Sequence, residues 1–269
     1  MICAGIDAGS RAIKVVLLDS ESGGLSAYGV IDQGVEQDAL AGRLFDRLLA
    51  EEALERGAVG RVVATGYGRD FVPFADTAIT EITCHACGVR HVAPDVRTII
   101  EVGGQDSKLI RLDPSGAVRD FAMNDRCAAG TGRFLEVVAS RLEVGLDTLG
   151  AMAARSGSPA AISSTCVVFA ETEIVGLLAR GVPGEDIVAG VQQAIARRVT
   201  AMAGPSVDEP ILLTGGVALV PGMADAMATA LGRPVRVVEH PQMTGALGAA
   251  ILAARQRVDP QAPGAILGQ

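Results

Sequence analysis

Near its start the chain reads Gly5-Ile6-Asp7-Ala8-Gly9-Ser10, in which an apolar strand runs into a glycine turn. The same arrangement returns at Val102-Gly103-Gly104-Gln105-Asp106 and again at Leu213-Thr214-Gly215-Gly216. Such turns expose backbone N–H groups and let a phosphate or a ribose approach the main chain closely. One turn alone reads as a tight bend between strands, but three in order favour a nucleotide-binding site.

Polar side chains on the first two turns are suited to phosphate chemistry. We expect the hydroxyl of Ser10 and the ammonium of Lys14 to reach phosphate oxygens, because both follow the first turn. Carboxylates hold Mg²⁺ and the water bound to it, so Asp7 and Asp106 are expected to serve one Mg²⁺ ion. Gln105 is the candidate for orienting the water that attacks the phosphoryl group. The predicted catalytic residues are therefore Asp7, Gln105 and Asp106.

The chain repeats one plan in two halves. Apolar patterns and turn residues predict strands over 2–7, 12–19, 25–31 and 62–65 and a helix over 39–54 in the first half. The second half begins with predicted strands over 98–102, 107–112 and 117–123. Helical periodicity then dominates residues 132–203, a strand is expected over 210–213, and a helix over 242–255 closes the chain.

The predicted fold is α/β, with two duplicated lobes around a nucleotide cleft. Neither a Walker-type loop nor a well-placed Gly-x-Gly-x-x-Gly is present, which disfavours the phosphate-loop and Rossmann folds. The remaining architecture is the one shared by actin, the heat-shock chaperone ATPases and hexokinase. We expect the first lobe over residues 1–94 with the helix 242–257, the second lobe over 95–241, and a loose tail over 258–269.

Charge and composition exclude several classes of partner. The 269-residue chain has a formal net charge of -8, which argues against a broad contact with nucleic acid or anionic lipid. No apolar stretch reaches the roughly 20 residues of a membrane span, and the start of the chain reads as a strand rather than a leader. Five cysteines, an odd number, argue against a disulfide framework. We therefore expect a cytoplasmic protein with no nucleic acid and no membrane among its partners.

Two cysteines stand just before predicted helices. Cys127 lies in the segment Asn124-Asp125-Arg126-Cys127-Ala128-Ala129-Gly130, and Cys166 follows Ser163-Ser164-Thr165. A helix N-terminus lowers a thiol pKa and favours an anion such as a thiolate-ligated iron–sulfur cluster. A 4Fe-4S cluster needs four thiolates, so a homodimer with two ligands from each subunit would complete one. Spacing alone also fits ordinary buried cysteines.

A second cysteine motif, Cys84-His85-Ala86-Cys87, has the spacing of half a zinc knuckle or of a redox pair. Together with Cys127 and Cys166 it could build a metal site within one chain. Against this, residues 81–89 read as the start of a helix, and the chain has no second Cys-x-x-Cys. Structural burial, an accessory redox role and metal ligation all stay open for Cys84 and Cys87.

These segments resemble the ATP-dependent activators of 2-hydroxyacyl-CoA dehydratases, in the family that also contains the ATPase subunits of benzoyl-CoA reductase. The resemblance covers nearly the whole chain, and several of its motifs are long enough to be specific. It is carried by residues 5–14, 64–69, 103–106, 124–134, 162–166, 169–173, 214–218 and 245–250.

The resemblance implies a homodimer in which Cys127 and Cys166 hold one 4Fe-4S cluster per dimer. It implies an enzyme that hydrolyses ATP, accepts one electron from ferredoxin or flavodoxin, and passes it to the iron–sulfur centre of a partner acyl-CoA dehydratase or reductase. It places the phosphates against Ser10 to Lys14 and Gln105, with Thr214 to Gly216 and Gln242 beside the nucleoside. Turns and resemblance together predict these nucleotide-binding residues: Gly9, Ser10, Arg11, Ala12, Ile13, Lys14, Gly103, Gly104, Gln105, Thr214, Gly215, Gly216 and Gln242.

Other functions are compatible with the same fold. The chain could be the ATPase subunit of a benzoyl-CoA reductase rather than a separate activator. A small-molecule kinase would need a catalytic aspartate aimed at a substrate hydroxyl, and no candidate stands apart from the phosphate turns. A filament-forming relative of actin is a third reading. Iron content separates the electron donor from the kinase and from the filament protein.

Overall fold

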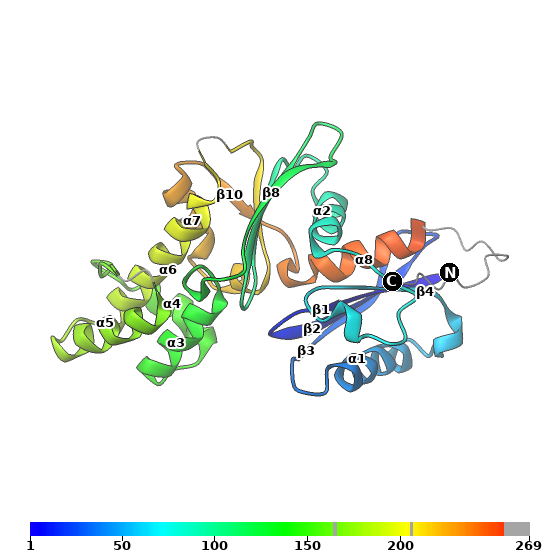
Figure 1. The fold of residues 1–269 in the computed structure, drawn as a ribbon, viewed down its shortest axis with the longest axis horizontal. Coiled ribbons are helices and arrows are strands. Elements are labelled where there is room, and N and C mark those ends of the chain that lie inside the picture. Colours follow the sequence, from blue (N-terminus) through cyan, green and yellow to red (C-terminus); the bar gives the residue numbers. More distant parts are fainter. Residues whose placement is uncertain (164–165, 205–206, 256–269) are drawn as a thin grey trace.

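The computed structural model describes residues 1–163, 166–204 and 207–255, and it contains two five-stranded sheets (Figure 1). The first sheet has the order β3-β2-β1-β4-β5 and the second the order β10-β9-β6-β7-β8. The first sheet is made of β1 (Ile2–Ala8), β2 (Ala12–Asp19), β3 (Leu25–Asp32), β4 (Val59–Thr65) and β5 (Thr77–Ala78). The second is made of β6 (Thr98–Val102), β7 (Ser107–Leu112), β8 (Val118–Asn124), β9 (Ile211–Thr214) and β10 (Val235–Val237).

Both sheets are built in the same way. Three antiparallel strands come first, and the first of them also pairs in parallel with a later strand, β1 with β4 and β6 with β9. β1 and β6 are mostly apolar and are buried almost throughout. Such burial is typical of strands that other parts of the chain cover on both faces. The duplication predicted from the sequence is therefore present.

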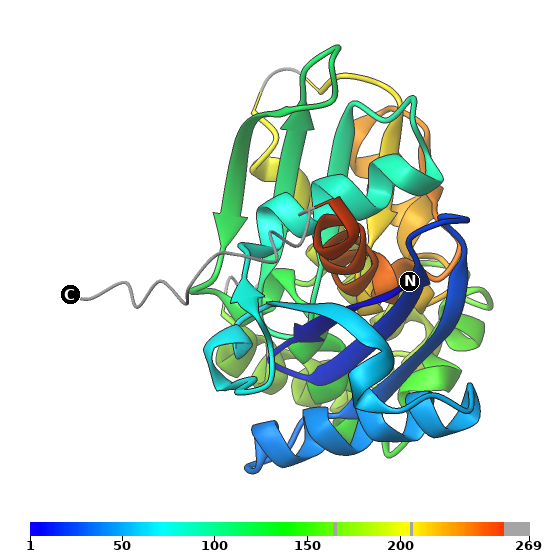
Figure 2. The same ribbon diagram turned by 90° about the vertical axis from the view of Figure 1, so that its right-hand side faces the viewer.

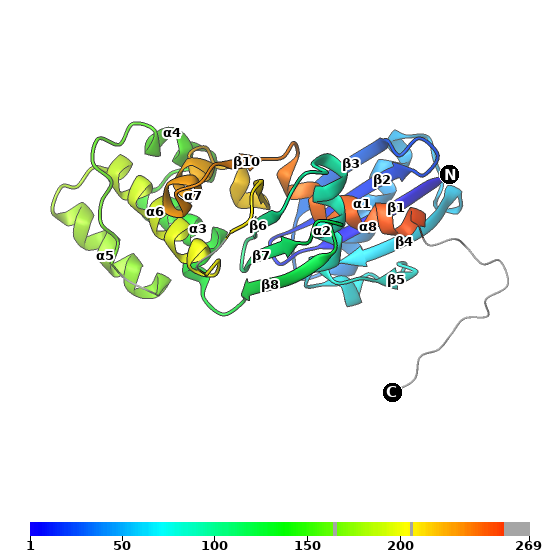
Figure 3. The ribbon, with the colours of Figure 1, turned by 90° about the horizontal axis from the view of Figure 1, so that it is seen from above.

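Helices cover the faces of the two sheets. They are α1 (Gln37–Glu51), α2 (Glu81–Val92), α3 (Gly132–Leu142), α4 (Leu149–Ala153), α5 (Val167–Ala179), α6 (Gly184–Ala201), α7 (Met223–Leu231) and α8 (Thr244–Arg255). α1 packs Leu44, Phe45 and Leu48 against the first sheet. α3, α5 and α6 pack together against the second sheet, at the end of the molecule opposite the first sheet (Figures 1 and 3).

Two helices lie between the sheets, and each packs against the sheet of the other half (Figure 2). α2 follows the first sheet in sequence, but its Ala86 and Val89 pack against the core of the second. α8 ends the described chain, and its Ala246 and Ala250 pack against Val16 and Leu18 of the first sheet. The predicted lobe boundaries at residues 94 and 241 remain a prediction, and residues 256–269, including the expected tail, lie outside the described residues.

The helices α2 and α8 cross at two glycines. A Cβ atom on Gly88 would overlap the carbonyl oxygen of Thr244, and one on Gly248 would overlap the carbonyl oxygen of Cys84, both closer than 3.0 Å. The backbones of the two helices therefore touch directly, which only glycine permits.

The sequence-based elements agree with the structure except at short or weakly patterned segments. The helix expected to reach residue 54 ends at Glu51, because Ala53 turns the chain with a φ of 54°. α7, the two-residue β5 and the three-residue β10 were not predicted. In the described part of the chain, no helix combines the length and apolarity needed to cross a membrane.

Candidate nucleotide site and cysteine pair

The hairpins β1–β2 and β6–β7 place matching residues in matching positions. Asp7 on β1 pairs with Lys14 on β2, and Glu101 on β6 pairs with Lys108 on β7. Each turn is closed by a backbone hydrogen bond, from the Gly9 N–H to the Ala12 carbonyl at 3.1 Å and from the Gly103 N–H to the Asp106 carbonyl at 3.0 Å. By register, the counterpart of Asp7 is therefore Glu101, while Asp106 takes the place of Ala12.

A glycine crowds each of these two carboxylates. Gly66 and Gly215 follow β4 and β9 and have φ angles of 88° and 86°. A Cβ on Gly66 would overlap the Asp7 carboxylate, and one on Gly215 would overlap that of Glu101, each closer than 3.0 Å. Because both glycines have the left-handed conformation and no room for a side chain, they hold the backbone tight against the two acids.

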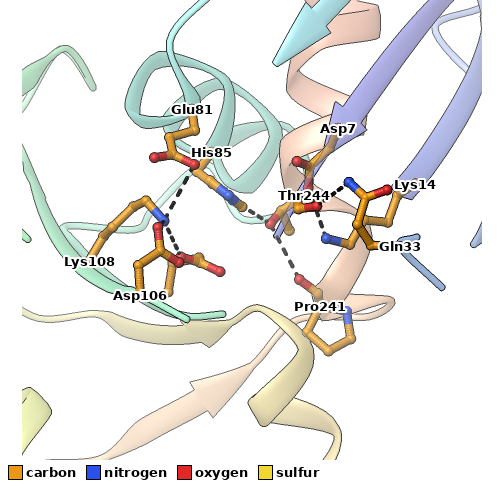
Figure 4. A network of polar contacts seen from close by, with 11 residues as sticks. Asp7, Lys14, Gln33, Glu81, His85, Asp106, Lys108, Pro241 and Thr244 are labelled. Carbon is orange, nitrogen blue, oxygen red and sulfur yellow. Dashed lines mark hydrogen bonds and ion pairs between the residues drawn. The ribbon is translucent and has the colours of Figure 1, made fainter. Parts of the chain in front are cut away.

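Asp7 lies buried at the end of β1 and is paired with Lys14. The distance from Asp7 Oδ2 to Lys14 Nζ is 3.3 Å, and Gln33 Nε2 donates to the carbonyl of Gly9 at 2.9 Å (Figure 4). The carboxylate, the ammonium and the first turn thus form one polar group at the end of the first sheet.

Lys108 is buried among three carboxylates in the second half of the site (Figure 4). Its Nζ lies 2.7 Å from Asp106 Oδ2, 2.9 Å from Glu101 Oε2 and 3.5 Å from Glu81 Oε2. Burial alone would lower the pKa of Lys108, but the three carboxylates raise it above its ordinary value. Lys108 therefore stays charged and holds Asp106, at the predicted phosphate turn, against the N-terminus of α2.

Protonation within this cluster is uneven. Burial raises the pKa of Glu81, and burial together with the charge of Glu101 raises that of Asp106. Burial also opposes ionisation of Glu101, but Lys108 outweighs it and holds the pKa of Glu101 below its ordinary value. Glu101 is thus the firmly ionised partner of Lys108.

His85 links α2 to α8 between the two polar groups (Figure 4). Its Nδ1 lies 2.9 Å from the hydroxyl of Thr244, which donates to the carbonyl of Pro241 at 3.3 Å. Burial lowers the pKa of His85, so its ring is neutral at neutral pH. A Cβ atom on Gly245 would lie 3.1 Å from Asp7 Oδ2 and 3.2 Å from the His85 ring. The contact between His85 and Thr244 therefore lies close to the Asp7 carboxylate.

The two turns predicted to bind phosphate, Gly9 to Lys14 and Gly103 to Asp106, touch each other, and we call them the first and second phosphate turns. The side chain of Arg11 packs on Gly104, and its Nε donates to Glu136 Oε1 of α3 at 2.7 Å. The N–H groups of Gly132 and Arg133 donate to the carbonyls of Gly103 and Gly104, both at 2.9 Å. The second turn is therefore bonded directly to the first turn of α3.

The predicted site residues fall into three groups. Gly9 to Lys14 and Gly103 to Asp106 form the two adjoining turns, and Gln105 is exposed on the second. The third turn is joined to the segment before Gln242, because Gly215 N–H donates to the Pro241 carbonyl at 2.9 Å. Asp7 and Asp106, which are expected to share one ion, are each paired with a lysine. What these residues do was a prediction and stays one.

Sequence reasoning missed Glu101 and Lys108. A signal was present, since Ile99-Ile100-Glu101-Val102 puts a carboxylate into an otherwise apolar strand, as Ile6-Asp7-Ala8 does. In both halves a lysine follows on the partner strand. Aligning the two hairpins residue by residue would have revealed both.

Cys127 lies on a segment whose two ends are fixed to the second phosphate turn and to Ser107, the residue that follows this turn. Asn124, at the end of β8, pairs with Ser107 of β7, and Gly132 bonds to Gly103. Asn124 also accepts from the Cys127 N–H at 3.0 Å and donates to its carbonyl at 2.8 Å. Cys127 precedes α3, as the sequence predicts, and the helix N-terminus that it occupies is that of the short 3-10 turn Ala128–Gly130.

Cys166 occupies the N-cap position of α5 and is half-buried, as is Cys127. Residues 164 and 165, which belong to the predicted motif, lie outside the described residues. Glu173 of α5 accepts from the Ser163 N–H at 3.0 Å and from its hydroxyl at 2.7 Å, which holds the preceding loop on the helix. Arg141 Nε of α3 donates to Glu171 of α5 at 2.6 Å and joins the two helices.

The pair Cys84 and Cys87 does not join the other cysteines. Cys84 is fully buried under α8, and burial raises its pKa to about 12. Burial also raises the pKa of Cys87. Across residues 1–163, 166–204 and 207–255, no three His, Cys, Asp or Glu side chains are grouped to hold a metal ion. A metal site built from Cys84, Cys87, Cys127 and Cys166 of one chain is therefore not formed there.

The donor set at Cys127 and Cys166 fits an iron–sulfur cluster shared by two chains. Half-buried thiols near helix N-termini are the ligand type that such clusters use. Val168 and Phe169, the next exposed residues of α5, leave 67% and 69% of their surface accessible beside Cys166. Neighbouring exposed apolar side chains of this kind can form part of a surface that another chain covers.

Comparison with known proteins agrees with this geometry. The activator of lactoyl-CoA dehydratase from Anaerotignum propionicum is 42% identical over 254 residues, which cover 94% of this chain and 97% of the relative. The solved activator of the 2-hydroxyisocaproyl-CoA dehydratase from Clostridium difficile with bound ADPNP matches with a TM-score of 0.90 and 41% identity, over 94% of each chain. A ROK family glucokinase from Streptomyces griseus, at 13% identity, covers 94% of this chain and 99% of its own with a TM-score of 0.57, and shows the fold alone.

These matches confirm the predicted duplicated α/β fold and the predicted resemblance. A family model matches residues 4–253, a span that contains both phosphate turns, the third glycine turn and both candidate ligand cysteines. The chain belongs to the BadF/BadG/BcrA/BcrD ATPase family.

Proposed function

We propose that this protein is an ATP-hydrolysing one-electron donor that activates a partner acyl-CoA dehydratase. In the proposed assembly, Cys127 and Cys166 of two identical subunits hold one 4Fe-4S cluster on the two-fold axis. The observation that carries the proposal is the attachment of the Cys127 segment, at Gly132 and at Asn124, to the second phosphate turn and to Ser107 directly after it. Such a connection is what coupling of a nucleotide to a cluster requires.

The nucleotide part of the proposal rests on the two adjoining turns. Backbone N–H groups of Gly9 and Gly103 to Gln105 would face the phosphates, and Lys14 would exchange part of its contact with Asp7 for a phosphate oxygen. Asp7 and Asp106 would hold Mg²⁺ and its water, with Lys108 orienting Asp106. Gln105, exposed on the second turn, would orient the attacking water. Thr214 to Gly216 and Gln242 would adjoin the nucleoside.

The electron-transfer part rests on the two cysteines. A bound cluster supplies the storage and release of single electrons, while the protein supplies its ligands and its exposure. Raising one electron by about 300 mV needs about 7 kcal/mol, since about 59 mV corresponds to a tenfold change. ATP can contribute that free energy only through a conformational change, in which the lobes 1–94 with 242–257 and 95–241 close on the nucleotide.

The partner is inferred from the relatives, which are named as activators of acyl-CoA dehydratases. We infer a partner with its own iron–sulfur centre, and ferredoxin or flavodoxin as the electron source. A reductase as the partner would give the same chemistry. We place this activity in the cytoplasm, where cysteine thiols stay reduced.

Iron content tests the cluster. Anaerobically purified protein is expected to be a brown dimer with about four iron atoms per dimer. Serine at Cys127 or at Cys166 should remove the iron, because each change deletes two of four ligands across the axis. The matched control is the double change of Cys84 and Cys87 to serine, which should leave iron unchanged. Full iron content in both single variants would refute the ligand assignment.

Nucleotide dependence tests the coupling, which a kinase or a filament protein would lack. Chelation of the iron should be much faster with MgATP than with MgADP, because lobe closure moves the segment that carries Cys127. Asp7→Ala and Asp106→Ala should abolish ATP hydrolysis while the cluster still assembles. Identical chelation rates in both nucleotide states would rule out a gated donor even if iron and ATPase activity were present.

A further inference from the structure

Arg198 of α6 points its guanidinium at the sulfur of Cys127. The distance from Arg198 Nη1 to Cys127 Sγ is 3.6 Å, within the range of an N–H···S hydrogen bond. The stem of Arg198 lies along Gly130, since a Cβ on that glycine would sit 3.5 Å from Arg198 Cγ and Cδ. The charged group is therefore aimed at the sulfur past the 3-10 turn that Cys127 begins.

The backbone of Arg198 is held rigidly. α6 is the central helix of the second core, and Ile195 and Val199, on either side of Arg198, are fully buried. Because the helix cannot rotate without breaking this core, the direction of the side chain is set by the fold. A group on a rigid helix holds its distance to a ligand better than a group on a loop.

Arg198 has no carboxylate partner in the described part of the chain, where no ion pair includes it. Its neighbour Arg197 is exposed and donates instead to Gln193 of the same helix at 3.4 Å. A half-buried guanidinium without a carboxylate, directed at a sulfur, keeps its whole charge available to that sulfur. The arrangement matters only if the sulfur carries negative charge.

We propose that Arg198 sets the reduction potential of the cluster by donating to the Cys127 sulfur and holding a positive charge beside it. The inference rests on the proposed function, in which Cys127 is a cluster ligand. Reduction of a bound cluster by an external one-electron reductant would add one unit of negative charge to its iron and sulfur, and Arg198 would offset part of that charge at the Cys127 sulfur. Arg198 neither gives up nor gains a proton, and no bond to it forms or breaks.

The physical reason is that hydrogen bonds to sulfur and nearby charge favour the more negative redox state. Two-fold symmetry would bring one Arg198 from each subunit, one at each Cys127. Arginine keeps its charge at every working pH, so the effect does not vary with pH. Arg198 is thus a positioning residue that acts through Cys127 rather than on a substrate.

The test compares Arg198→Met with the matched control Arg197→Met, which removes the same charge one residue away on the same helix. Midpoint potentials of the full-length dimers are measured by potentiometric titration with detection by electron paramagnetic resonance. We expect Arg198→Met to disfavour reduction about tenfold or more, a lowering of about 59 mV or more. Arg197→Met should leave the potential within a small fraction of that shift. Arg198→Lys, which keeps the charge without the planar donor, should fall between wild type and Arg198→Met.

The outcomes separate this inference from the proposed function. Wild-type protein without iron would refute the proposed function itself. Iron-loaded variants whose potentials equal that of the wild type, or equal shifts in Arg197→Met and Arg198→Met, would refute the role of Arg198 and leave the cluster in place. If Arg198→Met loses its iron, the potential of Arg198→Lys decides: a wild-type value there refutes the proposal, and a lowered one supports it.

Discussion

Replacing Lys108 by methionine removes the ammonium group that contacts Glu101, which is buried, and Asp106 and Glu81, which are half-buried. Methionine has a similar volume and fills the space, so the change mainly removes charge and hydrogen bonds. Lys108 is fully buried, with Asp106, Glu101 and Glu81 at 2.7, 2.9 and 3.5 Å from its Nζ. In Lys108→Met these carboxylates would face one another without compensation.

The expected loss is large. Removing one partner of a buried ion pair costs about 3–5 kcal/mol, because the other charge is left in a medium that solvates it poorly. Lys108 serves three acids, which places the variant toward the upper end of that range. Part of the cost is relieved when an acid takes up a proton, so the loss depends on pH.

The sign of the pH dependence follows from the pKa directions. In the wild type, Glu81 and Asp106 have raised pKa values, so their contribution to stability is largest at low pH. It is fully present below their ordinary pKa values, 4.5 for Glu81 and 3.8 for Asp106, and it is lost as the pH rises through the pKa of the folded state. The lowered pKa of Glu101 gives stability that is present above 4.5 and is lost as pH falls through its folded pKa. Without Lys108, the pKa of Glu101 should be raised by burial, as the pKa values of Glu81 and Asp106 are. All three acids then make the folded variant more stable at low pH.

The assay is urea-induced unfolding of wild type and Lys108→Met at about pH 7.5 and about pH 5.5. Between these two pH values, each proton that the folded variant takes up restores up to about 2.7 kcal/mol of unfolding free energy, at about 1.36 kcal/mol per pH unit. The difference in unfolding free energy between the two proteins should therefore narrow by up to about that amount. Arg119→Met is the control, since Arg119 forms exposed ion pairs with Asp120 and Asp208, and its unfolding midpoint should equal that of the wild type. A urea midpoint of Lys108→Met equal to that of the wild type would refute the reasoning. A difference in unfolding free energy that does not change with pH would refute it as well.

Two further changes probe the helix crossing and the second turn. Gly248→Ala should lower the free energy of unfolding by about 1–3 kcal/mol, because its Cβ would overlap the Cys84 carbonyl. The control Gly57→Ala, with no atom within 4 Å of its Cβ, should unfold at the wild-type urea concentration. Gln105→Ala should bind ATP nearly as the wild type does and hydrolyse it about tenfold or more slowly. Loss of ATP affinity equal to the loss of turnover, measured by calorimetry and phosphate release, would make Gln105 a binding residue.

Much of the fold could be predicted because the two hairpins repeat. Strands that end in glycine turns are signalled locally, by apolar runs and by residues that tolerate unusual backbone angles. The exchange of α2 and α8 between the sheets has no local signal. It depends on the contact of Gly88 with Thr244 and of Gly248 with Cys84, which are far apart in the sequence. The short β10 gave too few residues for a pattern.

The site was predicted in part for the same reason. Turn residues such as Gly103 and Gln105 are visible in the sequence, whereas the partner of a buried charge is a property of strand register. The turn sequence brought attention to Asp106, but pairing of β6 with β7 makes Glu101 the register counterpart of Asp7. Arg198 could not be inferred at all, because only packing of α6 on the 3-10 turn brings it to Cys127.

Cys127 and Cys166 differ in how a structural change at the nucleotide site would be transmitted to them. The segment of Cys127 is tied to the second turn through the bond from Gly132 to Gly103, and to the residue after this turn through the pairing of Asn124 with Ser107. Cys166 has no such tie in the described residues, and its helix is joined to α3 through Arg141 and Glu171. A shift of the turn would therefore move Cys127 directly, and Cys166 only as far as α3 carries α5 with it. If Cys127 and Cys166 move by unequal amounts, the space between their sulfurs is distorted. If they move equally, that space is only translated. In the proposed function ATP must change the energy of the electron and not merely its position, so the unequal attachment would supply what gating of a shared cluster requires.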